Sequence, residues 1–180
     1  MITDIPIKGI NYQLRSVNPG DSSEVLRLRL DSSLNSYIHE TSAEKHRSWL
    51  DEQLTKPGDY YFAIESLSNF SIQGFIGIYN LNEGRGEWGR WILNPTSPAA
   101  LESYWLILKF GFDLGLNQIY SRTDLRNLKV LSIHDSFQFT KTEIIRFGFD
   151  AIDYKVHTLD RKNWPVFEQN LKRYIRRRAN

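Results

Sequence analysis

The segment from Ser97 to Gly115 constrains the fold of this chain most strongly. Ser97 and Pro98 suit the N-cap and first position of a helix, and Gly115 suits its C-cap. Strand-like segments at 87–93 and 117–122 flank it, which predicts a β-α-β unit with a right-handed crossover. The helix should be buried along one side, because its apolar residues recur at the spacing of one helical face: Leu101, Tyr104, Trp105, Leu108 and Phe112.

The other segments predict antiparallel strands and further helices around this unit. Thr41 and Glu44 have the spacing of a capping box, which predicts a helix over 41–56. The resulting order is β-α-α-β-β-β-α-β-α-β-β and a last helix from about Trp164. This order predicts an α/β (α+β) fold with a mixed, mainly antiparallel sheet and helices on both faces. We expect one domain over 1–180, with strands at 12–17, 60–65, 72–79, 139–147 and 151–159 and helices at 22–30 and 127–137.

Composition excludes several classes of protein. The absence of cysteine rules out a disulfide scaffold, a thiolate metal site and a cysteine nucleophile. No His, Asp or Glu cluster has metal-ligand spacing, so no metal site is predicted. The N-terminus lacks the pattern of a signal peptide, and no apolar window is long enough for a membrane span, so a cytoplasmic protein is expected.

Charge is unevenly distributed along the chain. A net charge of +2 is too small to indicate nucleic acid as a partner by bulk electrostatics. Basic residues nevertheless crowd the C-terminus, which suits either a solvated helix end or a contact with phosphate or nucleic acid. These residues are Lys172, Arg173, Arg176, Arg177 and Arg178.

The segment 127–139 carries a family resemblance. It has Asn127, then Val130 three residues on, Ile133 and His134 at six and seven, and Phe139 at the end. With the element order, this spacing resembles the last core motif of the GNAT acyltransferases. Trp49 and Trp164 are similar to the branch that holds amino-sugar acetyltransferases and ribosomal-protein N-terminal acetyltransferases.

The resemblance implies acetyl-CoA as co-substrate, bound between the 87–93 strand, the start of the 98–113 helix and the 127–137 helix. The loop 94–101 lacks the glycines and the basic residue usual in the family, but backbone N–H groups at a helix N-terminus still attract phosphate. Small alanine side chains there leave room for the phosphates. The residues expected to bind acetyl-CoA are Trp91, Ile92, Leu93, Ser97, Ala99, Ala100, Leu101, Asn127, Ser132 and His134.

His134 and Glu87 are the candidate catalytic residues. His134 stands where the family usually has the tyrosine that protonates the leaving thiolate, and an imidazole with a pKa near ~6.5 can donate a proton in its charged form. It also suits a buried core position, since Val130, Ile133 and Phe137 share its helical face. Glu87 is the expected general base, directly or through water, with an exposed strand-edge carboxylate as the alternative. Strand alternation places Glu87 on one face with Gly89, Trp91 and Leu93.

The acceptor amine is less defined by the sequence. We expect polar side chains near the strand ends and in the 35–40 segment to contact it, namely Tyr37, His39, Glu40, Tyr79 and Asn80. The leading prediction is acetylation of a small primary amine such as an amino-sugar nucleotide. The alternatives are a protein N-terminal acetyltransferase and a GNAT-fold binding module without transfer activity. The resemblance also leaves a homodimer open, because such folds often pair.

Overall fold

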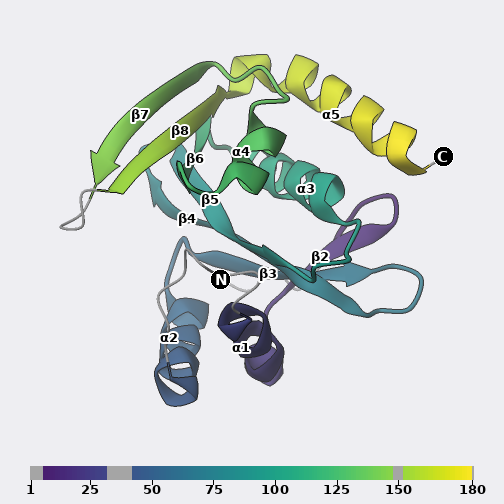
Figure 1. Cartoon of the computed structure of the whole chain (residues 1–180), viewed down its shortest axis with the longest axis vertical. Helices are drawn as coiled ribbons and strands as arrows, with labels where there is room; N and C mark the ends of the chain where they lie inside the picture. The colour runs from purple at the N-terminus through teal and green to yellow at the C-terminus, as the bar shows by residue number, and fades with distance from the viewer. Residues whose placement is uncertain (1–5, 32–41, 148–151, 180) are drawn as a thin grey trace.

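One eight-stranded sheet organises the molecule (Figure 1). The computed structural model describes residues 6–31, 42–147 and 152–179. Neighbouring strands are antiparallel except β5 and β6, which are parallel. The mixed, mainly antiparallel α/β fold is therefore confirmed. The strand order across the sheet is β1 (Ile7–Lys8), β2 (Tyr12–Ser16), β3 (Tyr60–Ser66), β4 (Ile72–Asn82), β5 (Arg85–Leu93), β6 (Gln118–Asp124), β8 (Ile152–Asp160) and β7 (Lys141–Phe147).

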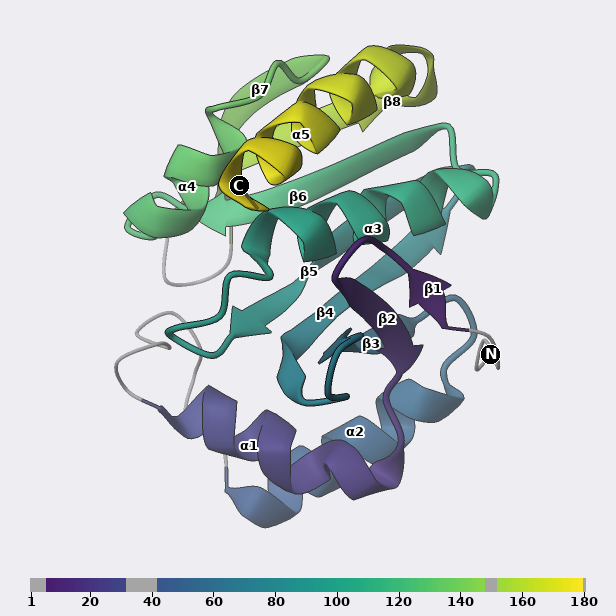
Figure 2. The ribbon, with the colours of Figure 1, turned by 90° about the vertical axis from the view of Figure 1, so that its right-hand side faces the viewer.

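Helices cover both faces of this sheet (Figure 2). On one face lie α1 (Ser22–Leu30) and α2 (Ala43–Thr55), which bury Val25, Leu28 and Leu50 against β3, β4 and β5. On the other face lie α3 (Ala100–Asp113), α4 (Leu128–His134) and α5 (Trp164–Ala179). The sheet thus separates two apolar cores. None of the helices in the described part of the chain is long and apolar enough to cross a membrane.

The helix α3 is buried on nearly all sides, which is more than the predicted single stripe. The sheet packs on one side of it and α5 on the other, so even Glu102 and Ser103 are inaccessible to solvent. The Glu102 carboxylate accepts hydrogen bonds from the backbone amides of Ile10, Asn11 and Tyr12, at 2.5, 2.8 and 3.1 Å. A buried carboxylate is stable only with such partners, and here it fixes the β1–β2 turn against α3.

Helix starts differ from the predicted ones. The α3 helix begins at Ala100 with Ala99 as N-cap, rather than with Ser97 as cap and Pro98 as first residue. The Ser97 hydroxyl instead accepts from the Ala99 amide at 3.2 Å, in a turn that precedes the helix. At α2 the N-cap is Ser42, whose hydroxyl accepts from the Lys45 amide, so the predicted cap at Thr41 is one residue early. The C-cap of α3 is Leu114, one residue before the predicted Gly115, which follows it with φ +96°, a conformation that glycine allows at low cost.

Candidate active site

The parallel strands β5 and β6 separate after a short paired segment. Their register covers three pairs and ends at Glu87 and Tyr120. Beyond this point β5 continues to Leu93, paired only with β4, and β6 continues to Asp124, paired only with β8. The edge of β5 that faces β6 therefore leaves backbone amides and carbonyls open from Trp88 onward. Backbone groups of this kind must find other partners, so the gap is suited to a bound chain of polar and apolar groups.

A β-bulge in β5 changes which side chains share a face. Three residues of β4, Phe75 to Gly77, oppose four residues of β5, Gly89 to Ile92, and Arg90 adopts φ +50°. Trp88 and Trp91 consequently lie on the same face, with ring centroids 5.6 Å apart. The predicted alternation, which placed Glu87 with Trp91 and Leu93, is wrong because the bulge inserts one residue.

Trp91, Ile92 and Leu93 line a cavity of about 150 Å³ at the open end of the gap, together with Ser97, Ala100 and Asn127. The structure thus brings together six of the residues expected to bind acetyl-CoA. The cavity also contains residues that the sequence reasoning did not single out for this role. They lie on the loop after β5 and on α4, and are Asn94, Pro95, Lys129, Val130 and Ile133.

Four of the expected acetyl-CoA contacts do not line this cavity with their side chains. Ala99 is completely buried, and Leu101 packs against the core around α3. Ser132 is exposed, and its hydroxyl donates to the Lys129 carbonyl. His134 points into the core, as described below. These placements follow from the late start of α3 and from the orientation of α4, which turns Val130 and Ile133 toward the cavity.

The cavity has the groups needed to hold a pyrophosphate and an extended thiol arm. The amides of Ala100, Leu101 and Glu102 have no hydrogen-bond partner among the described residues, as is usual in the first turn of a helix. Such a helix start attracts anions. Lys129 adds a positive charge at the rim, and Trp91 and Val130 give an apolar wall. Asn127 caps α4 through a hydrogen bond from the Val130 amide to its side-chain oxygen at 3.3 Å. These residues fit acetyl-CoA.

His134 is a core residue in this structure. Its ring is 1% exposed and packs against Trp88 and Tyr104, with centroids at 5.2 and 5.6 Å. Burial, with a smaller contribution from the neighbouring His157, lowers the pKa of His134 to about 3. The imidazole is therefore neutral at physiological pH. Proton donation from a charged His134, as expected from the sequence, does not fit this environment.

Glu87 is buried and tightly paired rather than exposed at a strand edge. It is 3% exposed, and the Arg122 guanidinium donates two hydrogen bonds to it, from Nε to Oε1 and from Nη2 to Oε2, both 2.8 Å long. Asn80 donates a third to Oε2 at 3.0 Å. The Tyr120 phenol also forms a hydrogen bond with this carboxylate. The exposed-carboxylate alternative is wrong.

A second ion pair lies beside Glu87 on the same face. Arg90 donates to both oxygens of Asp59, at 2.5 and 2.9 Å, and to the Gln53 side-chain oxygen at 3.1 Å. Its guanidinium also lies 4.2 Å from the centroid of the Tyr79 ring. Burial, and secondarily the Glu87 carboxylate, raises the pKa of Tyr79, so its phenol is protonated at neutral pH.

Both ion pairs lie on the face of the sheet that α1 and α2 cover. Arg29 of α1 lies 4.5 Å from the Trp49 ring centroid, and its Nε has no partner within the described ranges. Of the residues expected to contact the acceptor, Tyr79 and Asn80 lie here, beside Glu87. Tyr37, His39 and Glu40 lie outside the described residues. Among the residues that the structure describes, no group of three or more His, Asp or Glu is arranged to hold a metal ion.

Sequence reasoning did not assign a site role to four other residues of this face, namely Arg90, Asp59, Arg122 and Trp49. A signal existed for Arg122: it lies two residues after Tyr120, the strand partner of Glu87, and therefore on the same face of the sheet. The pair of Arg90 with Asp59 has no such signal, because it depends on the bulge.

Known structures have the same fold. The chain is similar to apo FdhC, described as a nucleotide-linked sugar GNAT, with 23% identity, a TM-score of 0.77, and coverage of 96% of this chain and 99% of that one. A GCN5-related N-acetyltransferase from Brucella melitensis matches with 16% identity, a TM-score of 0.74 and coverage of 96% and 86%. A spermidine N-acetyltransferase chimera of Vibrio cholerae SpeG and hSSAT matches with 16% identity, a TM-score of 0.73 and coverage of 87% and 99%.

Sequence comparison gives the family. No curated protein matches the chain. The family model described as Acetyltransferase (GNAT) domain matches residues 12–140, which contain the β5–β6 gap, the cavity and both ion pairs. Members of this family use acetyl-CoA as co-substrate. The chain belongs to the GNAT acetyltransferase family and is an N-acetyltransferase.

Proposed function

We propose that the enzyme transfers an acetyl group from acetyl-CoA to the primary amine of a small anionic molecule, such as an amino-sugar nucleotide. The donor would occupy the cavity at the open end of the β5–β6 gap. Its pyrophosphate would meet the first-turn amides of α3, and its pantetheine arm would run along the open edge of β5 past Asn127.

The acceptor would approach from the opposite face of the sheet. The α3 face of the gap is filled by Trp88, Tyr104 and His134, with α4 and α5 outside them. The α1–α2 face instead presents Glu87, Tyr79 and Arg122 at the point where the strands part. An amine that reaches the thioester through the gap therefore meets these side chains.

The charge of this face carries the substrate assignment. Within the described residues it contains three guanidinium groups, from Arg29, Arg90 and Arg122, and two carboxylates, from Asp59 and Glu87, and both carboxylates already accept from arginine. A polycation such as spermidine would be repelled by the net positive charge of these described residues. A phosphate-bearing molecule would meet the excess positive charge of this face, and Trp49 offers a ring for stacking. The structural similarity to a nucleotide-linked sugar GNAT supports the same class.

The chemistry needs a proton acceptor and an oxyanion site. The neutral amine nitrogen attacks the thioester carbonyl carbon, the N–C bond forms, and the C–S bond breaks to release the coenzyme A thiolate. Glu87 would accept the amine proton through a bound water molecule. The open amides of β5 beyond Trp88 would stabilise the oxyanion. The thiolate would take a proton from water, since His134 is neutral and buried.

Release of coenzyme A thiol with a panel of amines tests this proposal. The amino-sugar nucleotide should give the highest kcat/KM, above a peptide with a free N-terminus and above spermidine. A preference for the peptide would establish the protein N-terminal alternative instead. Thermal unfolding with acetyl-CoA at ~100 times its dissociation constant should show about 2.7 kcal/mol of added stability. If acetyl-CoA adds no stability and no thiol is released, the alternative of a binding module without transfer activity would be supported.

A further inference from the structure

The α5 helix concentrates positive charge that the acetyltransferase site does not use. Residues 161–180 contain seven Lys and Arg against one Glu, which leaves the other 160 residues with sixteen basic against twenty acidic groups. Lys162, Arg173, Arg176 and Arg177 are exposed and form no ion pair with any residue in the described ranges. The one acidic residue, Glu168, is paired with Lys172 at 2.7 Å. A small net charge therefore conceals a strongly basic surface.

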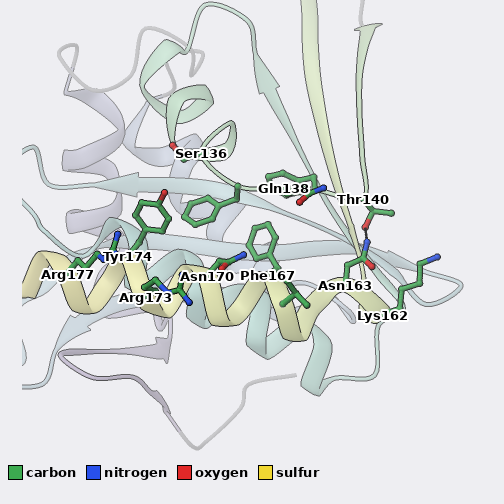
Figure 3. A pocket seen from close by; sticks show the side chains of 13 residues that line it. Ser136, Gln138, Thr140, Lys162, Asn163, Phe167, Asn170, Arg173, Tyr174 and Arg177 are labelled. Atoms are coloured by element: carbon green, nitrogen blue, oxygen red, sulfur yellow. Dashed lines mark hydrogen bonds between the residues drawn. The ribbon is translucent and has the colours of Figure 1, made fainter.

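A groove runs beside this surface (Figure 3). It has a volume of about 640 Å³ and lies between α5 and the 136–140 loop that follows α4. A second hollow of about 560 Å³ adjoins it on α5, and Arg173 and Arg177 line both. A ligand that contacts both hollows must cross the ridge formed by these two arginines. That geometry suits an extended polymer better than a single small molecule.

The groove offers aromatic and amide groups next to the cations. Tyr174 is 45% exposed and packs edge-on against Phe137, with centroids 5.4 Å apart, so one aromatic surface is open to a ligand. Gln138 and Asn170 supply both donors and acceptors, and none of the described residues that line the groove is a carboxylate. Single-stranded nucleic acid is bound by this combination, in which cations track the phosphates and aromatic rings stack on the bases.

Other polyanions match these features less well. A lipid surface would require an apolar helix face, but Phe167, Leu171 and Ile175 of α5 are buried against the core. An acidic peptide would pair with the cations. It would not use the exposed Tyr174 ring in combination with the amide donors and acceptors of Gln138 and Asn170. We propose that the groove between α5 and residues 136–140 binds single-stranded nucleic acid, with Arg173, Arg176 and Arg177 on the phosphates and Tyr174 stacked on a base. The α5 helix, of 16 residues, is roughly 24 Å long, which suits several nucleotides.

Fluorescence anisotropy with labelled oligonucleotides of about 12 residues, one of RNA and one of DNA, tests the proposal on the full chain. Binding should weaken with salt, and Arg173→Gln/Arg177→Gln should reduce the slope of log K against log salt by about 1.4. The matched control is Lys45→Gln/Arg47→Gln, which removes the same charge from exposed positions of α2 on the opposite face of the sheet.

Tyr174→Leu separates nucleic acid from other polyanions. It keeps every positive charge, and loss of one stacked base should weaken oligonucleotide binding by about fivefold or more, without changing the affinity for polyglutamate. Circular dichroism confirms that each variant is folded. The proposal is overturned if the α2 control weakens binding as much as the α5 variant. It is equally overturned if polyglutamate binds as tightly as the oligonucleotides, which would indicate an acidic protein partner.

Discussion

The two faces of β5 differ in how they are built. On the α3 face, Trp88, Trp91 and Leu93 contribute apolar surface, and the polar groups near the cavity are mostly backbone amides. On the α1–α2 face, Glu87 and Arg90 each sit in a bidentate ion pair. In our proposal the first face recognises the co-substrate, common to the family, by its shape and by backbone dipoles. The second face would recognise the acceptor by its charge, which can change from one member to another. Substrate selectivity should therefore reside in the ion-paired face.

The largest effect should come from a charge placed on the donor side. Ala100→Asp puts a carboxylate at the first turn of α3, where we expect the pyrophosphate. Like charges about 4 Å apart near a protein surface repel by about 4 kcal/mol, so acetyl-CoA affinity should fall by roughly 1000-fold. The same aspartate suits a helix N-terminus, so unliganded stability should not decrease. Calorimetric titration gives the affinity, and Ala100→Ser is the control. An unchanged affinity would show that acetyl-CoA does not bind at this helix start.

Removing the proposed base should affect turnover rather than donor binding. Glu87→Gln abolishes proton acceptance and leaves Arg122 without its buried counter-ion. General-base loss should lower kcat by roughly 100-fold, while acetyl-CoA affinity is unchanged. Glu143→Gln, in an exposed pair with Lys141 on β7, serves as the control. A Glu87→Gln enzyme with full kcat would show that the acceptor-face carboxylate only has a structural role.

Acid should destabilise the fold through buried neutral histidines on both faces. Burial lowers the pKa of His134 to about 3 and of His46 to about 4, from an ordinary value of 6.5. Between the lowered pKa values and 6.5, the unfolded chain binds more protons than the folded chain. The free energy of unfolding is therefore highest above pH 6.5 and falls as the pH drops toward 4. Each histidine should contribute a slope of about 1.4 kcal/mol per pH unit. Denaturant unfolding from pH 7 to pH 4.5 measures this slope, and His134→Phe should remove the contribution of one histidine. An unchanged slope in that variant would contradict the burial of His134.

The smallest effect should be that of His134 on catalysis. Because its ring is neutral and surrounded by aromatic residues, His134→Phe should keep kcat at pH 7.5 within about threefold of the wild-type value. Any inflection in the pH profile of kcat near pH 6.5 should be present in both the wild type and this variant. A large loss of kcat with retained stability would restore His134 as the proton donor.

The fold could be predicted from the sequence where periodicity was strong. The apolar spacing of 101–112 and the turn residues around it identify α3, and the spacing from Asn127 identifies α4, because these signals come from local burial and capping. Six of the ten expected acetyl-CoA contacts line the cavity, because they lie at the end of β5, in the loop that follows it, and at the starts of α3 and α4. The start of α3 was less predictable, since Ser97 caps a preceding turn instead.

The acceptor face could not be predicted in the same way. Its arrangement depends on the bulge at Arg90, and nothing in Gly89-Arg90-Trp91 alone specifies a positive φ for an arginine. One trace is Gly89, where a Cβ atom would lie 2.5 Å from the Tyr79 hydroxyl. That constraint involves a residue ten positions away on β4, so it becomes visible only once the strands are paired. Long-range ion pairs such as Arg90 with Asp59 follow from the same tertiary contacts.

The most direct test of the ion-paired face is one ratio of specificity constants. The kcat/KM for an amino-sugar nucleotide is compared with that for the same amino sugar without its nucleotide, at low salt, in the wild type and in Arg29→Gln. We predict a ratio of at least about tenfold in the wild type, the equivalent of one charge-assisted contact, and a clear decrease in the variant. Equal values for the two sugars, or a preference for spermidine over both, would contradict the assignment of this face to an anionic acceptor.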